Sequence, residues 1–224
     1  MVVEIVGSAG AGKTTLLQVL GRHNRKFCAV FHFRRIRYYP FFAGSALLLL
    51  PTLVRLRRLR KRLAWREIRM MVHLQAMPHI LEDGPTSNDA IAIVDQGPIY
   101  MLSRLHESGF GDFKDPTLDR WWSSVLDRWA AILDLVIWLD ASDVVLVERI
   151  HARAKLHSIK GKSQQQAYDF LARFRRSYEQ IISGLTARGG PRIVAFQTDQ
   201  QPLQQILQEV LAAFDSGQYV NEAA

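Results

Sequence analysis

A glycine-rich segment near the N-terminus, GSAGAGKT from Gly7 to Thr14, constrains the fold of this chain more than any other feature. It follows a short apolar run with β-branched residues, Val2–Val6, and leads into Thr14–Leu20, which has the apolar spacing of a helix. Glycines let a backbone wrap closely around a ligand and turn its N–H groups toward it. The pattern GxxxxGK[ST] between a strand and a helix therefore predicts a binding site for the phosphates of a nucleotide.

The side chains of this loop fit the β and γ phosphates of ATP together with Mg²⁺. Lys13 supplies a point charge for the phosphate oxygens, Thr14 supplies a hydroxyl to Mg²⁺, and Thr15 can reach the α phosphate. The start of the helix adds the positive end of its dipole. We therefore predict that the nucleotide contacts the whole loop, namely Gly7, Ser8, Ala9, Gly10, Ala11, Gly12, Lys13, Thr14 and Thr15.

Four more short apolar runs have the character of strands buried on both faces. They are Ala29–Phe33, Ala90–Val94, Leu135–Leu139 and Arg192–Phe196. Helical patterns separate them, with start signals at Asp115–Pro116, at Ser163 with Gln166 in capping-box spacing, and at Pro202. This alternation predicts an α/β fold, a three-layer doubly wound parallel sheet of about five strands that binds ligands beyond the carboxyl ends of its strands.

Length and composition fit a single domain covering residues 1–224. The chain has 224 residues, of which 48% are hydrophobic. Within the domain we expect a helical insertion at about 38–82 and a helical lid at about 153–163. Cys28 is the only cysteine, which excludes an intrachain disulfide and a multi-cysteine metal site, and the N-terminus does not resemble a secretory signal. We therefore expect a cytoplasmic protein.

An acidic residue at the end of another parallel strand would complete such a site, and Asp95 is the best candidate. Its carboxylate can hold Mg²⁺ through water or accept a proton from an acceptor hydroxyl, and the sequence leaves both roles open. The alternative is that Asp95 only caps the turn before Pro98. Asp140 ends the next strand, but Ser142 or Asp143 as a helix cap explains that segment at least as well.

Three segments resemble the P-loop kinases of nucleosides and nucleotides, the superfamily of thymidylate kinase, adenylate kinase and deoxynucleoside kinase. GSAGAGKTT (7–15) resembles their phosphate loop, VIWLDASDVVLVERIHAR (136–153) their fourth strand with the helix into the lid, and FLARFRRSYEQI (170–181) the next helix. The resemblance covers Met1–His32 and Ala90–Phe214. It implies that Arg149 stacks on the adenine of ATP and that Arg153 reaches the phosphates as the lid closes.

The spacing of Arg149 and Arg153 agrees with this implication, because residues four apart share one face of a helix. The segment around and beyond them is basic and contains Gly161, which suits a lid that closes over a triphosphate and expels water. The alternative is an exposed basic loop without a ligand. The basic residues of this loop are His151, Lys155, His157, Lys160 and Lys162.

The acceptor side departs from these families. Gln96 stands where they commonly have arginine after the strand-three acid, and HFRRIRYYP (32–40) replaces the expected acceptor-binding residues. The arginines of this segment can bind a phosphorylated or carboxylated acceptor, or form a solvated strand end: Arg34, Arg35 and Arg37. Three tryptophans at helical spacing are expected in the core rather than in a base-stacking platform: Trp121, Trp122 and Trp129.

The net charge of +8 is concentrated in one segment, residues 55–69, which holds eight basic residues and one acid and so carries +7. Leu56, Leu59 and Leu63 lie along one side of this predicted basic helix, a pattern that can rest on an anionic membrane. The interpretation we favour from sequence is an insertion whose apolar part packs on the domain while its charges stay in water. Nucleic acid is disfavoured because Trp65 is the only aromatic residue of this segment.

The apolar part itself, Tyr38–Val54, carries no charge but contains Pro40, Gly44 and Pro51. We expect these residues to interrupt it, and it is shorter than the ~20 residues that a membrane-spanning helix needs. Spanning is therefore not expected.

Together these features predict a cytoplasmic, Mg²⁺-dependent phosphotransferase that moves the γ-phosphoryl of ATP to a small-molecule acceptor, with Lys13, Asp95 and Arg153 as catalytic residues and Thr14 and Asp95 at the metal. The main alternative is a regulatory or membrane-associated NTPase that hydrolyses ATP without such an acceptor. The acceptor and the oligomeric state stay open, with a homodimer among the options.

Overall fold

The computed structural model describes residues 1–23, 27–28, 38–58, 63–82, 91–110, 115–154 and 157–221. Several predictions fall outside these residues and are not tested by the structure. They are the strand at Ala29–Phe33, the three arginines Arg34, Arg35 and Arg37, the middle of the basic segment at 59–62, and Lys155 in the lid.

A parallel sheet forms the middle of the molecule, in the order β2-β3-β1-β4-β5. β1 (Val2–Val6) lies between β3 (Ile91–Asp95) and β4 (Leu135–Asp140), with β5 (Arg192–Gln197) beyond β4. These four strands have five or six residues each, and the two-residue β2 (Phe27–Cys28) adds an edge. The predicted α/β fold with a doubly wound parallel sheet is confirmed, and these four strands begin and end within one residue of the predicted positions.

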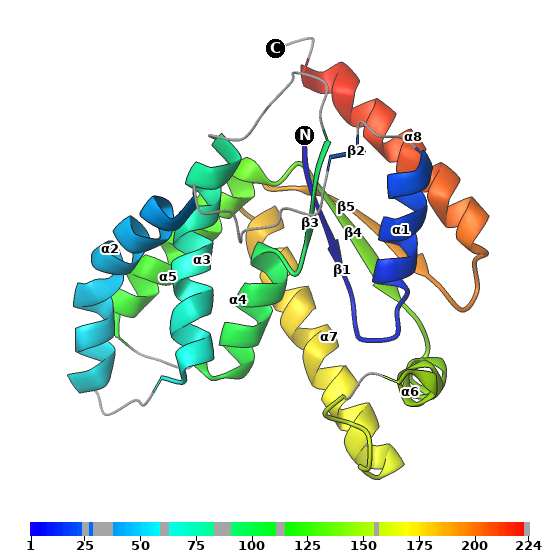
Figure 1. Ribbon diagram of the computed structural model, residues 1–224, viewed down its shortest axis with the longest axis horizontal. Coiled ribbons are helices and arrows are strands. Elements are labelled where there is room, and N and C mark those ends of the chain that lie inside the picture. Colours follow the sequence, from blue (N-terminus) through cyan, green and yellow to red (C-terminus); the bar gives the residue numbers. More distant parts are fainter. Residues whose placement is uncertain are drawn as a thin grey trace.

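Helices cover both faces of the sheet, so the fold has the three layers predicted from the sequence (Figure 1). One face packs on α1 (Lys13–His23) and α8 (Leu203–Asn221), with Val3 and Ile5 of β1 in the shared core. The other face packs on helices that include α4 (Pro98–Glu107), α5 (Pro116–Ile132) and α7 (Gln164–Thr186), where Val6 of β1 is buried. The alternation of strand side chains explains this division.

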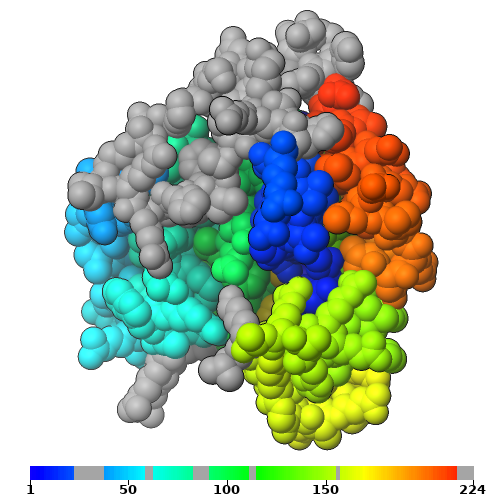
Figure 2. All heavy atoms as spheres, turned by 45° about the vertical axis from the view of Figure 1, so that its right-hand side comes forward, coloured from blue at the N-terminus to red at the C-terminus, as the bar shows by residue number. Residues whose placement is uncertain are grey.

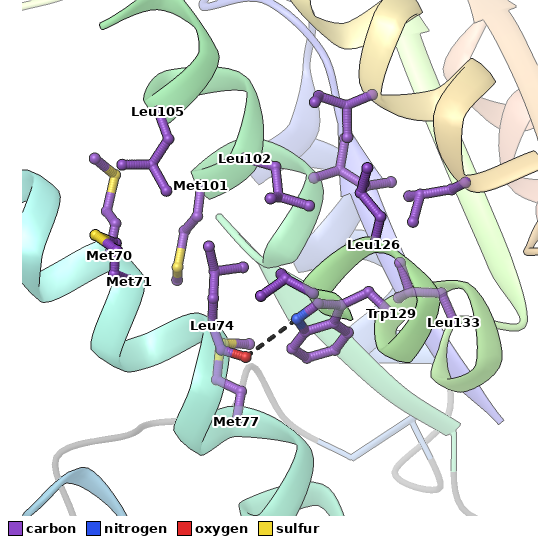
Figure 3. Packing of buried hydrophobic residues seen from close by; sticks show 14 of the residues in the cluster. Met70, Met71, Leu74, Met77, Met101, Leu102, Leu105, Leu126, Trp129 and Leu133 are labelled. Carbon is purple, nitrogen blue, oxygen red and sulfur yellow. Dashed lines mark hydrogen bonds between the residues drawn. The ribbon is translucent and has the colours of Figure 1, made fainter. Parts of the chain in front are cut away.

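The larger core centres on Trp129 of α5, whose indole is fully buried. Its Nε1 donates a hydrogen bond to the backbone oxygen of Leu74, 3.2 Å away, and methionines of two helices pack around it (Figure 3). The interaction satisfies the one polar atom of the ring and ties α5 to α3 (Trp65–Glu82). Trp121 and Trp122 are partly buried against the same core, so the prediction of core tryptophans is confirmed.

Two helices begin where the sequence predicts. Asp115 accepts hydrogen bonds from the N–H groups of Thr117 and Leu118 at the start of α5. Ser163 and Gln166 form the reciprocal capping box at the start of α7, with each side chain accepting from the other's backbone N–H. Such caps satisfy the N–H groups that a helix leaves unpaired at its start.

The segment predicted as an insertion, residues 38–82, contains two helices, α2 (Tyr39–Arg58) and α3, which pack against each other. The expected interruption of the apolar part is wrong, because α2 runs through Pro40, Gly44 and Pro51. Pro40 lies in the first turn, where its missing N–H is not needed, and Pro51 is exposed, so water can satisfy the carbonyl that its ring leaves unpaired. By length and composition α2 is also the one described helix that could cross a membrane, which alone is weak support for a span.

The single basic helix predicted at 55–69 is also wrong, because α2 ends at Arg58 and a second helix begins at Trp65. Glu67 accepts the backbone N–H of Ala64, 2.8 Å away, which caps the start of α3 and separates it from α2. The lid differs as well. Its described residues, 153–154 and 157–163, form turns between α6 (Asp143–Ala152) and α7 rather than a helix, with Gly161 in a left-handed conformation at φ 81°.

Candidate active site

The glycine-rich loop closes tightly against β4 and α6. Gly7 has φ 142°, and a side chain there would place its Cβ 2.0 Å from the backbone oxygen of Leu139. A Cβ on Gly10 would lie 3.0 Å from the oxygen of Leu146. Only glycine fits at Gly7, and the loop therefore keeps the wrapped shape that presents backbone N–H groups at the start of α1.

The ammonium group of Lys13 is held over this loop. Its Nζ donates to the backbone oxygens of Gly7 at 2.6 Å and of Ser8 at 2.9 Å. Burial lowers the pKa of Lys13 to about 8, with a smaller lowering from Arg153, while the carboxylate of Asp95 acts in the opposite direction. Lys13 is thus a partly desolvated cation that gains from a nearby negative charge.

One cavity of about 320 Å³ brings the predicted catalytic residues together. Lys13 and Thr14 line it from the loop and α1, Asp95 from the end of β3, and Arg153 from the end of α6. These residues lie far apart in the sequence and meet because parallel strands end at the same edge of the sheet. The loop residues Gly7, Ser8 and Ala9 line the same cavity.

The hydroxyl of Thr14 and the carboxylate of Asp95 are the oxygen donors that fit Mg²⁺ in this cavity. Within the described ranges, no group of three or more His, Cys, Asp or Glu side chains is placed to hold a metal ion. Mg²⁺ does not need such a group, because it usually keeps several waters and takes one or two protein ligands besides the phosphates. The donor set therefore fits a magnesium ion that is held mainly by the nucleotide.

Glu4, which the sequence analysis did not single out, stabilises the turn after Asp95 through hydrogen bonds to the backbone. Gln96 has φ 55°, which is uncommon for a residue with a side chain, and Gly97 is the N-cap of α4 without a capping side chain. Glu4 of β1 takes over the capping, since its two carboxyl oxygens accept the N–H groups of Ile99 at 2.8 Å and Tyr100 at 3.1 Å. Burial raises the pKa of Glu4 to about 8.

Aromatic side chains form the wall of the cavity opposite the loop. Tyr100 comes from α4, and Phe170, Phe174 and Tyr178 come from α7. The Phe174 ring lies with its centroid 4.9 Å from that of Phe170, and the Arg104 guanidinium carbon lies 4.9 Å from the same Phe174 centroid. This wall offers flat apolar surface next to a cation, which suits a planar ring with polar substituents.

A second cavity of about 220 Å³ lies on the other side of the loop, lined by Gly10, Ala11, Gly12 and Thr15. Arg149 lines it too, and its guanidinium donates to the hydroxyl of Thr198 at 2.9 Å and to the Thr198 backbone oxygen at 3.0 Å. Both contacts fix the plane of the guanidinium at the mouth of this cavity. Figure 2 shows the yellow-green residues of α6 and the lid directly below the dark blue start of the chain.

Arg153 lines both cavities, but not for the reason predicted. The two arginines were expected on one face of a helix, whereas α6 ends at Ala152 and Arg153 is the extended C-cap with φ −80° and ψ 142°. The backbone oxygen of Arg153 accepts a hydrogen bond from Lys160, so the lid folds back on this residue. Arg153 therefore lies where α6 joins the segment that the sequence predicts as the lid.

Asp140 has a structural partner rather than a place in either cavity. Arg175 of α7 binds both of its carboxylate oxygens, at 2.6 and 3.2 Å, and also reaches Asp143 at 2.9 Å. Ser142 is the N-cap of α6, without a side-chain capping bond, so the helix-cap interpretation is confirmed by position. The Arg175 pairs join α7 to the start of α6.

The residues that the sequence analysis missed differ in whether the sequence could have indicated them. Thr198 follows a predicted strand at its carboxyl end, where ligands gather in a doubly wound sheet, so the topology could have indicated it. Phe174 and Tyr178 lie in the segment 170–181 that resembles a kinase helix, but the sequence does not show which of its residues line the cavity. Glu4 and the left-handed Gln96 carry no local signal, because their roles depend on contacts between β1 and the turn after β3.

The sheet order, the glycine-rich loop and the flanking cavities define the class of fold as a P-loop α/β domain. No protein-family model matches the sequence, and no curated protein matches it either. The structure is similar to a deoxyadenosine kinase from M. mycoides solved with bound dCTP, at 14% identity and a TM-score of 0.50, covering 96% of this chain and 100% of that chain.

It is also similar to the thymidylate kinase from Candida albicans, at 14% identity and a TM-score of 0.55, covering 96% of this chain and 91% of that chain. At such low identity these similarities establish the fold alone. The chain has the fold of the P-loop nucleoside and nucleotide kinases, as the resemblance of its three segments implied.

Proposed function

We propose that this protein is a cytoplasmic small-molecule kinase that transfers the γ-phosphoryl group of ATP to a hydroxyl of a nucleoside or nucleotide. The observation that carries the proposal is the shared cavity, in which a phosphate loop with Lys13, the carboxylate of Asp95 and the aromatic wall from α4 and α7 face one another. An enzyme that only hydrolysed ATP would have no use for that wall.

The two cavities divide the donor between them. The loop backbone and Lys13 bind the β and γ phosphates, and the negative charge of these phosphates stabilises the partly desolvated Lys13 ammonium. Arg149, fixed by Thr198, offers the flat face of its guanidinium to the adenine at the second cavity. Arg153 lies between the two and reaches the phosphates from the lid side.

The transfer step needs one proton acceptor and stabilisation of the charge on the phosphoryl oxygens. The acceptor oxygen bonds to the γ phosphorus, the bond from that phosphorus to the bridging oxygen breaks, and ADP leaves with the electron pair. Asp95 takes the proton of the acceptor hydroxyl, while Lys13 and Arg153 stabilise the phosphoryl oxygens. Thr14, with Asp95 acting through water, would hold Mg²⁺ against the phosphates, and the ion would supply further charge stabilisation there.

The acceptor class follows from the wall. Phe174 with its neighbouring ring can stack on a base, and Arg104 beside it can donate to base oxygens or nitrogens. Arg104 also donates to Glu107 at 2.9 Å, which fixes the orientation of the guanidinium. The similar solved kinases act on or bind nucleotides, as their names state, which agrees with this class.

The test is ADP release from ATP in the presence of Mg²⁺, measured with and without a panel of nucleosides, nucleotides, sugars and other hydroxylated metabolites. We expect strong stimulation by one nucleoside or nucleotide and little turnover without an acceptor. The matched control is the Asp95→Asn variant, which should lose the stimulated rate. A rate of ADP release that no acceptor stimulates would contradict the proposal and favour an NTPase.

A further inference from the structure

One face of α2 is apolar and exposed along most of the helix. Leu47 and Leu48 are 66% and 69% exposed, whereas Leu49 and Leu56 are buried against the rest of the insertion. Successive residues turn by about 100° around a helix, which places all the exposed large side chains on one half of its circumference. We call them the α2 face: Tyr39, Leu47, Leu48, Leu50 and Val54.

Exposed apolar surface of this kind, when continuous, usually marks an interaction site. The α2 face is unlike the rest of the described surface, where the only other exposed large hydrophobic residues are Trp65, Val144 and Leu203. Trp65 is the first residue of α3, the helix that packs against α2, and it is 75% exposed.

The end of the α2 face is strongly basic. The last turn of α2 carries Arg55, Arg57 and Arg58, all exposed, and Arg66 and Arg69 of α3 are exposed close by in the chain. Arg55 is paired with Asp115 at 2.8 Å, which anchors α2 to the start of α5. No acidic residue occurs in α2, so an occupant of this face meets apolar and positive surface only.

We propose that the α2 face is a docking surface for an anionic lipid bilayer. Leucine and valine side chains enter the boundary between headgroups and acyl chains, and Arg57 and Arg58 bind the headgroup phosphates. Tyr39 and Trp65 have the amphipathic rings that favour this boundary, with apolar bodies and a polar atom that stays hydrated.

The helix rests on the bilayer rather than crossing it. As a helix, the uncharged stretch Tyr39–Val54 is only about 24 Å long, short of the roughly 30 Å hydrocarbon core. Its other side is buried, with Ser45, Leu49 and Leu56 enclosed by the insertion. Crossing would expose this packed side and pull Arg55 away from Asp115.

The charge pattern favours an anionic bilayer over a second copy of the chain. Two α2 faces would bring only apolar and positive side chains together, and neither copy would supply the acids that the arginines need. A bilayer with anionic headgroups supplies both the apolar layer and the negative charge in the same plane.

Docking through α2 leaves the nucleotide cavities open. Figure 1 shows α2 at the outer edge of the molecule, with α3 and α5 beside it and the sheet beyond them. The basic end of α2 points to the same side as the loop after β1, where the strands end. A membrane against α2 therefore lies beside the catalytic edge without covering it, so docking is independent of the proposed kinase activity.

The test is cosedimentation of the full chain with vesicles of phosphatidylcholine and phosphatidylserine in equal amounts, compared with phosphatidylcholine alone. We expect binding to the anionic vesicles that weakens as salt rises, since screening shortens the range of the arginine charges. Leu47→Gln with Leu48→Gln should weaken binding at least tenfold. Arg57→Gln with Arg58→Gln should weaken it about 25-fold, because each basic residue contributes about fivefold.

Matched controls carry the same changes elsewhere. Val144→Gln removes an exposed apolar side chain from α6, and Arg120→Gln with Arg176→Gln removes two exposed charges from α5 and α7. Neither control should change vesicle binding. All variants change exposed side chains and should keep the wild-type thermal midpoint. A measurement on the unaltered helix, quenching of Trp65 fluorescence by brominated lipid against Trp65→Phe, should show the ring at the bilayer.

Three results would overturn the proposal. The first is the absence of binding to anionic vesicles, with Trp65 unquenched. The second is binding that survives Leu47→Gln with Leu48→Gln. The third is a wild-type dimer, seen by analytical ultracentrifugation, that becomes a monomer in this variant while vesicles do not bind, because the α2 face would then be an interface between copies.

Discussion

A carboxyl oxygen of Glu4 on β1 accepts the backbone N–H of Ile99 at the start of α4, with 2.8 Å between oxygen and nitrogen. The contact joins the central strand to the helix that follows Asp95, so it supports the turn directly after Asp95. A Cβ on Gly97 would lie 2.9 Å from the carboxyl carbon of Glu4, which shows how closely the two elements approach. A buried acid thus replaces the local cap that α4 lacks.

The pH dependence of folding should reveal this group. Burial raises the pKa of Glu4 from 4.5 to about 8 in the folded protein. Between these values Glu4 binds more protons in the folded state than in the unfolded state, so its contribution to stability is greatest below pH 4.5 and falls as pH rises toward 8. The Glu4→Gln variant lacks this titrating carboxyl group. As pH rises from 4.5 to 8, its stability relative to wild type should therefore increase by on the order of 1 kcal/mol per pH unit.

Urea unfolding of both proteins at several pH values measures this difference, and the comparison cancels the other titrating groups. A stability difference with the opposite slope would mean that the N–H groups of Ile99 and Tyr100 hold Glu4 ionised. The Glu209→Gln change on α8 is a suitable control, because Glu209 is exposed and lies away from β1.

Removal of the Lys13 ammonium should nearly abolish phosphoryl transfer. Lys13→Ala removes charge-assisted contacts in a partly desolvated site, each of which contributes on the order of 2 to 4 kcal/mol to the transition state. We expect the ATP-dependent rate to fall by about 100-fold or more while circular dichroism stays unchanged. Wild-type activity in this variant would remove the phosphate-loop assignment.

Nucleotide affinity should weaken above pH 8 for a related reason. The pKa of Lys13 lies at about 8 in the free protein, and only the protonated form attracts the phosphates. Affinity is therefore full below this pH and falls as the pH rises through it. Lys13→Arg keeps its charge in this range, so any affinity it retains should be independent of pH, as titration calorimetry from pH 7 to 9 can show.

Substitution of Asp95 should separate chemistry from binding. Asp95→Asn keeps the size of the side chain but removes its charge and its ability to take a proton. We expect turnover to fall by about 100-fold or more with a much smaller change in nucleotide affinity. If Asp95→Asn matched wild type in acceptor-stimulated ADP release, the acid of the site would have to be another residue.

The fold was predictable from the sequence because its strands are buried on both faces and its helices carry explicit start signals. β1, β3, β4 and β5 appear as continuous apolar runs, and Asp115 and Ser163 mark helix starts by residue type alone. The loop and Asp95 were predictable for a similar reason. A motif fixes the loop, and the topology of a doubly wound sheet places strand ends together.

What failed depended on tertiary contacts or on competing local signals. The prolines of α2 indicate a break, but one lies in the first turn and the other is exposed, so the helix continues. The basic stretch indicates one helix, but Glu67 starts a new one. Glu4 lies within an apolar run, and only the position of α4 shows why a carboxylate is there.

The contact between Arg149 and Thr198 should control affinity for the donor. Arg149→Ala removes the guanidinium from the second cavity and should raise the KM for ATP about tenfold, the size of a partly desolvated cation–π contact. Thr198→Val keeps Arg149 but removes one of its hydrogen bonds, so the increase should be smaller. Steady-state kinetics with saturating acceptor measures both, and an unchanged KM for ATP in Arg149→Ala would place the adenine elsewhere.

The aromatic wall should act on the acceptor and not on ATP. Phe174→Leu keeps most of the side-chain volume but removes the ring that packs against Phe170 at an angle of 45° and lies under Arg104. Aromatic contacts contribute about 0.5 to 1.5 kcal/mol beyond the burial of area, so the KM for the acceptor should rise between about twofold and tenfold.

Phe214→Leu on α8 is the matched control, because Phe214 is equally a buried core ring but lines neither cavity. Both variants should lose similar stability, on the order of 1 kcal/mol, so only the acceptor KM separates them. A rise in the KM for ATP of the same size, or an equal effect in Phe214→Leu, would show that the ring supports the fold and does not contact the acceptor.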